Sequence, residues 1–193
     1  MPSVASSWVA PKSAVLGGTA AVAGTAYPFL DASGNQCAIP FLGSSRLDGQ
    51  PFRIKAAGKF TGGSSTVTIL ISLYFGAVTV AKPLTISATA SSNTLIETVP
   101  VQTITSLNGN FYMEVTGIWD KTSGRLTCYG TSVSSITDGT GTLTASTIAD
   151  AIPAAVTTLN TEGTNAFCVF GTFGTTAVAA NAAYLTLFSL ELI

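Results

Sequence analysis

The sequence predicts an all-β fold, a jelly-roll-like β-sandwich of about eight strands that follows an extended N-terminal arm. Apolar and polar residues alternate with a period of two in several segments, which is the pattern of strands buried on one face. Turn residues separate these segments at the short intervals expected in a sandwich or barrel. No segment of useful length has the period of an amphipathic helix. A chain of 193 residues is long enough to bury these strands around one core.

Residues 1–45 differ from the rest of the chain and are predicted to form the arm. Ala, Gly, Ser, Thr and Val dominate this segment, and Lys12 and Asp31 are its only charged residues. Such a segment buries little by itself, so we expect it to be ordered by packing on the domain or on a neighbouring subunit. The sandwich domain is predicted to span residues 46–193. The larger apolar side chains of the arm are the predicted assembly contacts: Trp8, Val9, Val15, Leu16, Tyr27, Phe29 and Phe41.

Residues 52–76 have the clearest strand pattern. In the first half, apolar residues alternate with polar or small ones, so a strand would bury one face and expose Arg53, Lys55 and Lys59 on the other. Thr61-Gly62-Gly63-Ser64 then supplies turn residues. A second apolar row follows from Val67 to Phe75. We therefore predict that this stretch is a β-hairpin and one wall of the sandwich.

Further strands are predicted over residues 77–88, 94–104, 111–119, 125–133, 165–174 and 184–193. Asn108-Gly109-Asn110 is a typical hairpin turn sequence, which predicts a turn before the strand that begins at Phe111. The strands over 111–119 and 125–133 are predicted to form a second hairpin. The strand over 165–174 is apolar on both faces, which predicts burial on both sides.

Charge is scarce in this chain. Hydrophobic residues make up 47% of it and charged residues 9%, whereas roughly 25% of the residues in typical proteins are charged. Surface charge keeps monomers soluble and apart, and the cores of permanent interfaces are depleted of charge. We therefore expect an assembly to cover much of the surface. The alternative is a monomer that its many Ser, Thr, Asn and Gly residues solvate.

The charge distribution also argues against two classes of partner. The net charge is −1 and the eight cations are scattered, so the chain lacks the basic surface of a nucleic-acid-binding protein. The uncharged run over 60–81 contains Gly62-Gly63 and strand-like alternation, which favours strands over a membrane-spanning helix. We expect neither nucleic acid nor membrane as a partner.

The usual chemistry of an active site is missing. The chain contains no histidine, which removes the commonest general base and the Ser-His-Asp arrangement. The nine carboxylates are isolated in the sequence, and no phosphate-binding or nucleophile motif occurs. We predict no enzymatic activity, no cofactor, and no catalytic, cofactor-binding or metal-binding residues. Cys37, Cys128 and Cys168 are widely spaced, so we expect buried free thiols, with one disulfide plus one free thiol as the alternative.

Aromatic residues leave a second type of function open. A carbohydrate-binding platform is one interpretation of these side chains, because aromatic faces stack on sugars. The core and the subunit interface are the favoured interpretation, because aromatic side chains bury large areas. The candidates for such a platform are Trp8, Trp119, Tyr74, Tyr112 and Tyr129.

The succession FRIKAAGKFTGG, TVTILISLYFG, GNFYMEVTGIWDKTSGRL and NAFCVFGTFGTTAVAANAAYLTLFSLE resembles jelly-roll capsid decoration (cement) proteins of tailed bacteriophages. The resemblance covers residues 52–193 and is one of pattern and order. It implies a structural virion protein, a homo-oligomer and often a trimer, that is assembled in the host cytoplasm and bridges neighbouring capsomers on the capsid surface. Its partners would be the major capsid protein and other copies of the chain. The alternative is a receptor- or glycan-binding module of a phage tail fibre or head appendage.

Overall fold

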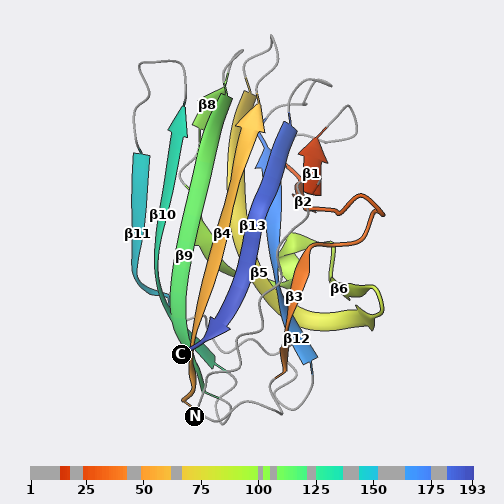
Figure 1. Cartoon of the computed structure of the whole chain (residues 1–193), viewed down its shortest axis with the longest axis vertical. Helices are drawn as coiled ribbons and strands as arrows, with labels where there is room; N and C mark the ends of the chain where they lie inside the picture. The colour runs from red at the N-terminus through yellow and green to blue at the C-terminus, as the bar shows by residue number, and fades with distance from the viewer. Residues whose placement is uncertain are drawn as a thin grey trace.

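Two antiparallel sheets make up the computed structural model, which describes residues 14–17, 24–42, 49–61, 67–99, 102–104, 108–120, 125–136, 144–151, 164–174 and 182–193. Figure 1 shows the sheets as two layers, with sheet A toward the viewer. The order of sheet A is β1 (Ala14–Gly17), β13 (Ala182–Leu192), β4 (Pro51–Thr61), β9 (Asn108–Asp120), β10 (Arg125–Ile136) and β11 (Thr144–Ala151).

Sheet B is built around the pair β12 (Thr164–Phe173) and β5 (Val67–Ala81). Two short strands pair with β12, namely β2 (Ala26–Pro28) and β3 (Ala38–Leu42). Three more pair with β5, namely β6 (Leu84–Ile86), β7 (Thr94–Thr98) and β8 (Gln102–Ile104). The described residues contain no α-helix, and a single 3₁₀ turn, η2 (Ala90–Ser92), lies between β6 and β7.

The predicted all-β sandwich is therefore confirmed, although the described residues contain thirteen strands in place of about eight. Six of these strands are short segments of three to five residues. A segment of this length holds too few residues for alternation to stand out in the sequence.

The core between the sheets is rich in aromatic side chains. Phe41 lies at its centre, with ring centroids 5.4 Å from Phe52, 5.7 Å from Phe75, 5.9 Å from Trp119 and 5.6 Å from Phe167. All four contacts are edge-on, which is a favoured geometry for aromatic pairs. Two strands of sheet A and three strands of sheet B supply these five rings, so the cluster joins the two layers.

The predicted hairpin over residues 52–76 is wrong, because its two strands lie in different sheets. The predicted faces are confirmed: the even positions of β4 are buried and Arg53, Lys55 and Lys59 point outward. However, β4 pairs with β13 and β9 in sheet A, and β5 pairs with β12 in sheet B. Alternation specifies which face of a strand is buried, and it leaves the pairing partner open.

The second predicted hairpin is confirmed, since β9 and β10 pair along their whole length. The turn predicted at Asn108-Gly109-Asn110 is wrong, because these residues begin β9 and Gly109 pairs with Phe60 and Ile136. Turn sequences of this kind specify a conformation only where no sheet neighbours compete for the backbone. The strand over 165–174 is buried on both faces, as predicted.

The N-terminal segment contributes strands to both sheets. β1 pairs with β13 at one edge of sheet A, and β2 and β3 pair with β12 in sheet B. The side chains of Phe29 and Phe41 are buried in the main core, and Tyr27 packs against it. Strands on both sides of the predicted boundary at residue 45 thus share the same two sheets.

Candidate binding surface

The two sheets differ sharply in charge. The strands of sheet B contain a single charged residue, Glu97, which is 2% exposed and whose Oε1 accepts a hydrogen bond of 2.8 Å from the backbone N–H of Thr98. Sheet A therefore holds nearly all the charge of the strands, and its outer face is the polar face of the sandwich. The charged residues in its strands are Arg53, Lys55, Lys59, Glu114, Asp120, Arg125, Asp150 and Glu191.

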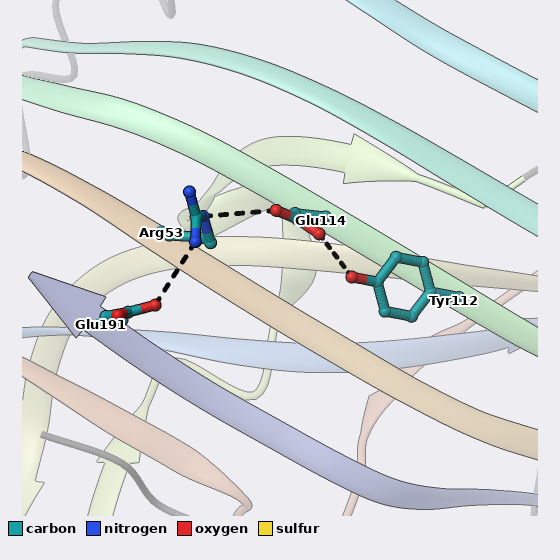
Figure 2. Close-up of polar contacts among 4 residues, drawn as sticks. All are labelled: Arg53, Tyr112, Glu114 and Glu191. Atoms are coloured by element: carbon teal, nitrogen blue, oxygen red, sulfur yellow. Dashed lines mark hydrogen bonds and ion pairs between the residues drawn. The ribbon is translucent and has the colours of Figure 1, made fainter. Parts of the chain in front are cut away.

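A polar network crosses three neighbouring strands on this outer face (Figure 2). Arg53 on β4 lies between two carboxylates, with its Nε 3.3 Å from Oε1 of Glu114 on β9 and its Nη1 3.6 Å from Oε2 of Glu191 on β13. The second oxygen of Glu114 accepts a hydrogen bond of 2.5 Å from the hydroxyl of Tyr112. The strand register makes this possible, because Arg53 pairs directly with Glu191 and Lys55 pairs with Glu114.

The environment of Tyr112 keeps its phenol protonated. Burial, followed by the hydrogen bond and the negative charge of Glu114, raises its pKa to about 12 from the ordinary value of 10.0, although Arg53 acts in the opposite direction. The hydroxyl therefore remains a donor to Glu114 at neutral pH. As a result, Tyr112 and Glu114 hold each other in a defined orientation on the surface.

Two of the five candidate platform aromatics are exposed on this face. Tyr112 is 36% exposed and Tyr129, on the neighbouring strand β10, is 51% exposed. Trp119 is completely buried in the core, and Tyr74 is partly buried on sheet B, where its ring centroid lies 4.9 Å from that of Phe170. Trp8 lies outside the described residues. Tyr112 and Tyr129 are therefore the two sequence candidates that are exposed together on this face.

The outer face of sheet B carries a second apolar cluster, formed by Ala38, Ile86, Ala166, Cys168 and Phe170. Leu84 and Ala90, from the segment that runs from β6 to η2, pack against it. The side chain of Gln36 makes two hydrogen bonds to the backbone of this segment. Its Nε2 donates to the main-chain oxygen of Ile86 at 3.1 Å, and its Oε1 accepts from the backbone N–H of Ile86 at 3.0 Å.

Exposed aliphatic residues accompany this cluster on the strands of sheet B. Leu95 on β7 is 50% exposed and Val80 on β5 is 48% exposed. Leu95 pairs with Tyr74, whose ring packs against the cluster, so it points to the same side of the sheet. This side thus offers apolar surface without charge on its strands.

A shallow pocket of about 410 Å³ lies between residues 24–28 and residues 88–91. The Asn93 amide fixes one wall by donating to the oxygens of Ser87 at 2.8 Å and Thr89 at 3.2 Å. All the lining residues are uncharged, which leaves the pocket suited to neutral groups. No sequence signal marked it, because its walls come from segments that are distant in the chain.

The predicted assembly contacts fall into three groups. Trp8 and Val9 lie outside the described residues. Val15 and Leu16 pair with Tyr184 and Ala183 of β13. The others are Phe29 and Phe41, which are buried in the core of the chain itself, and Tyr27, which packs against that core. These three side chains therefore anchor the N-terminal segment to its own domain.

The three cysteines are buried and form no disulfide. Burial, and to a lesser degree the charge of Asp31, raises the pKa of Cys37 to about 12. Burial likewise raises the pKa of Cys168, and the neighbouring Cys37 adds to this effect. Thiols in this state are poor nucleophiles and poor metal ligands. In the described part of the chain, no group of three or more His, Cys, Asp or Glu side chains is placed to hold a metal ion.

The described residues contain no helix with the length and hydrophobicity that a membrane crossing requires.

No protein-family model matches the chain, and no curated protein matches it. Among solved structures, it is similar to arcelin-5, a lectin-like defense protein from Phaseolus vulgaris, with 8% identity over 98% of both chains and a TM-score of 0.36. It is also similar to the metal-free form of lectin I-B4 from Griffonia simplicifolia, with 10% identity over 93% of both chains and a TM-score of 0.33. A protein of unknown function with a galectin-like fold from Bacillus subtilis has 9% identity over 88% of this chain and 96% of its own, with a TM-score of 0.25. Similarities of this size are no basis for assigning a function.

Proposed function

We propose that the chain is a structural virion protein that decorates the outer surface of a phage capsid and bridges neighbouring capsomers without catalysing a reaction. The observation that carries this proposal is the unequal distribution of charge between the two sheets. The strands of sheet B carry one charged residue, the buried Glu97, and expose Leu95 and Val80. Interface cores are depleted of charge in this way, whereas the polar rim and the solvent-facing side keep it.

In this arrangement, the side of sheet B faces the capsid or another copy, and the outer face of sheet A faces solvent. Each copy would bury a modest apolar area. Many copies on one lattice would act together, because linked binding events reinforce one another. The resemblance of the sequence pattern to phage decoration proteins agrees with this role, and a trimer would present several such faces at once.

The test compares one new charge on each face. Leu95→Glu places a carboxylate on the exposed side of sheet B, and Ile118→Glu places one on the outer face of sheet A, where Ile118 is 42% exposed. Both positions are accessible in the isolated chain, so both variants should fold. Light scattering over a dilution series measures the oligomer, and re-addition to capsids assembled without the protein measures binding and the gain in capsid melting temperature.

We expect Leu95→Glu to weaken oligomer formation or capsid binding, because a charge in an interface core must lose its hydration. Ile118→Glu should behave like the parent protein. The proposal would be refuted if the two variants formed oligomers and bound capsids equally well. It would also be refuted if the parent protein stayed monomeric and did not bind capsids.

A second candidate function is a glycan- or receptor-binding module of a tail fibre or head appendage. The exposure of Tyr112 and Tyr129 on the charged face favours it, because tyrosine combines an apolar ring with a polar hydroxyl and is enriched at binding interfaces. A glycan array distinguishes this candidate from a purely structural role.

A further inference from the structure

We propose that the outer face of sheet A binds an extended oligosaccharide along β9 and β10, with Tyr112 and Tyr129 as stacking platforms and Glu114 as a hydrogen-bond acceptor between them. This inference rests on the second candidate function and specifies its site. It is also compatible with capsid decoration, because a subunit attached through the side of sheet B would present this face to the environment.

The strand register sets the spacing of the two rings. Tyr129 pairs with Thr116 across the β9–β10 ladder, and Thr116 lies four residues beyond Tyr112 on β9. At about 3.4 Å per residue and about 4.8 Å between strands, the Cα atoms of the two tyrosines are roughly 14 Å apart. A single pyranose ring is too short to reach both, so the site fits a chain of sugars.

Glu114 occupies the middle of this span. On β9 its side chain points outward between those of Tyr112 and Thr116. Arg53 and Tyr112 each engage one of its oxygens, which fixes the carboxylate while leaving lone pairs for further donors. A sugar hydroxyl that lies between the two rings would meet an acceptor that is already oriented, which lowers the entropic cost of binding.

Two more features suit a sugar chain. Thr116 and Thr127 add hydroxyl groups near Tyr129, because Thr127 is its outward neighbour on β10 and both are partly exposed. Tyr129 also lies opposite an irregularity in the β10–β11 ladder, where Cys128 pairs with Ala151 and Gly130 pairs with Ile148. Bulges of this kind redirect a side chain and occur often at functional sites.

The composition of the face favours a saccharide over a protein partner. Protein interfaces cluster their aromatic anchors at a charge-depleted centre. Here the two rings stand apart, and ion-paired Arg53 and Glu114 lie beside and between them. Polar groups that alternate with aromatic rings match a ligand whose own surface alternates between hydroxyl groups and C–H faces.

The experiment is a glycan array of neutral and acidic oligosaccharides, followed by titration of the best-binding oligosaccharide and its monosaccharide with purified protein. Tyr129→Ala and Tyr112→Ala remove one ring each, whereas Tyr129→Phe keeps the ring and removes only the hydroxyl. Leu95→Ala is the control, because Leu95 is a similarly exposed apolar residue that lies on the other sheet, away from the proposed site. Circular dichroism establishes that each variant is folded.

We expect the oligosaccharide to bind and the monosaccharide to bind far more weakly. Each Tyr→Ala change should weaken binding by roughly tenfold, the factor that corresponds to the loss of one good aromatic contact. Tyr129→Phe and Leu95→Ala should bind like the parent protein.

Three results would overturn the inference. The first is a glycan array on which no oligosaccharide binds the protein, and the second is equal affinity for monosaccharide and oligosaccharide. The third is a loss of binding in Leu95→Ala as large as that in Tyr129→Ala. A silent array together with reduced capsid binding in Tyr129→Ala would assign the face to a protein partner. The Leu95→Glu experiment tests capsid decoration separately, so either proposal can fail without the other.

Discussion

Phe41 provides the sharpest test of how the N-terminal segment is held. The sequence predicted an assembly contact at this position, and in the structure the ring is 1% exposed and contacts four other aromatic rings. Phe41→Ala would leave a cavity in the centre of this cluster. Substitutions of this type cost about 3–5 kcal/mol, from a total that is typically about 5–15 kcal/mol. For a domain of this size, the melting temperature should fall by roughly 6–20 °C.

The assay is urea denaturation of dilute protein, monitored by circular dichroism. The slope of the unfolding transition is compared between variants. Leu95→Ala is the control, and it should cost about 1 kcal/mol or less because half of its surface is already in solvent. An unchanged midpoint for Phe41→Ala, combined with a loss of assembly, would refute the core placement and restore the interface interpretation.

Three further predictions concern a glycine, a tyrosine and the thiols. Gly58→Ala should destabilise the protein by about 2 kcal/mol or more, because a methyl group there would lie 2.0 Å from the main-chain oxygen of Tyr184; an unfolding midpoint equal to that of the parent would contradict this. Glu114→Gln should lower the pKa of Tyr112 from about 12 toward 10.0, measured as the difference in tyrosinate absorbance from Tyr112→Phe. Because burial first and Glu114 second raise the folded pKa above the unfolded value, the stability contributed by protonated Tyr112 is complete below pH 10.0 and is lost as the pH rises through about 12; a titration of Tyr112 that the substitution leaves unchanged would show that Glu114 does not contribute to the raised pKa. A thiol reagent at neutral pH should leave the folded protein unmodified and react with all three cysteines, Cys37, Cys128 and Cys168, after denaturation; a single reactive thiol in the denatured protein would instead indicate a disulfide.

The sequence predicted which face of each strand is buried, because the alternation of apolar and polar residues within a strand marks its buried face. On β9, Phe111, Met113 and Val115 point inward and Tyr112 and Glu114 point outward, as the alternation predicts. The pairing of β4 with β13 was not predictable, because backbone hydrogen bonds are equally good with any strand of suitable length. The choice among partners depends on packing summed over both sheets.

The candidate surface was predictable only in part, for the same reason. The outward positions of Arg53 and Tyr112 follow from alternation, and both aromatic platform residues were among the candidates. The ion pair between Arg53 and Glu191 depends on the register of β4 with β13, which no local pattern reveals. The same holds for Gln36, whose side chain holds β6 from a distant part of the chain.

The position of β13 in sheet A affects how each copy is made. Among the described strands, β13 is the last in sequence, and it lies between β1, the first of them, and β4. During synthesis, β4 has one open edge until β13 leaves the ribosome. Pairings between distant segments form slowly, and unpaired strand edges are prone to aggregate. Sheet A therefore cannot close until β13 has been synthesised.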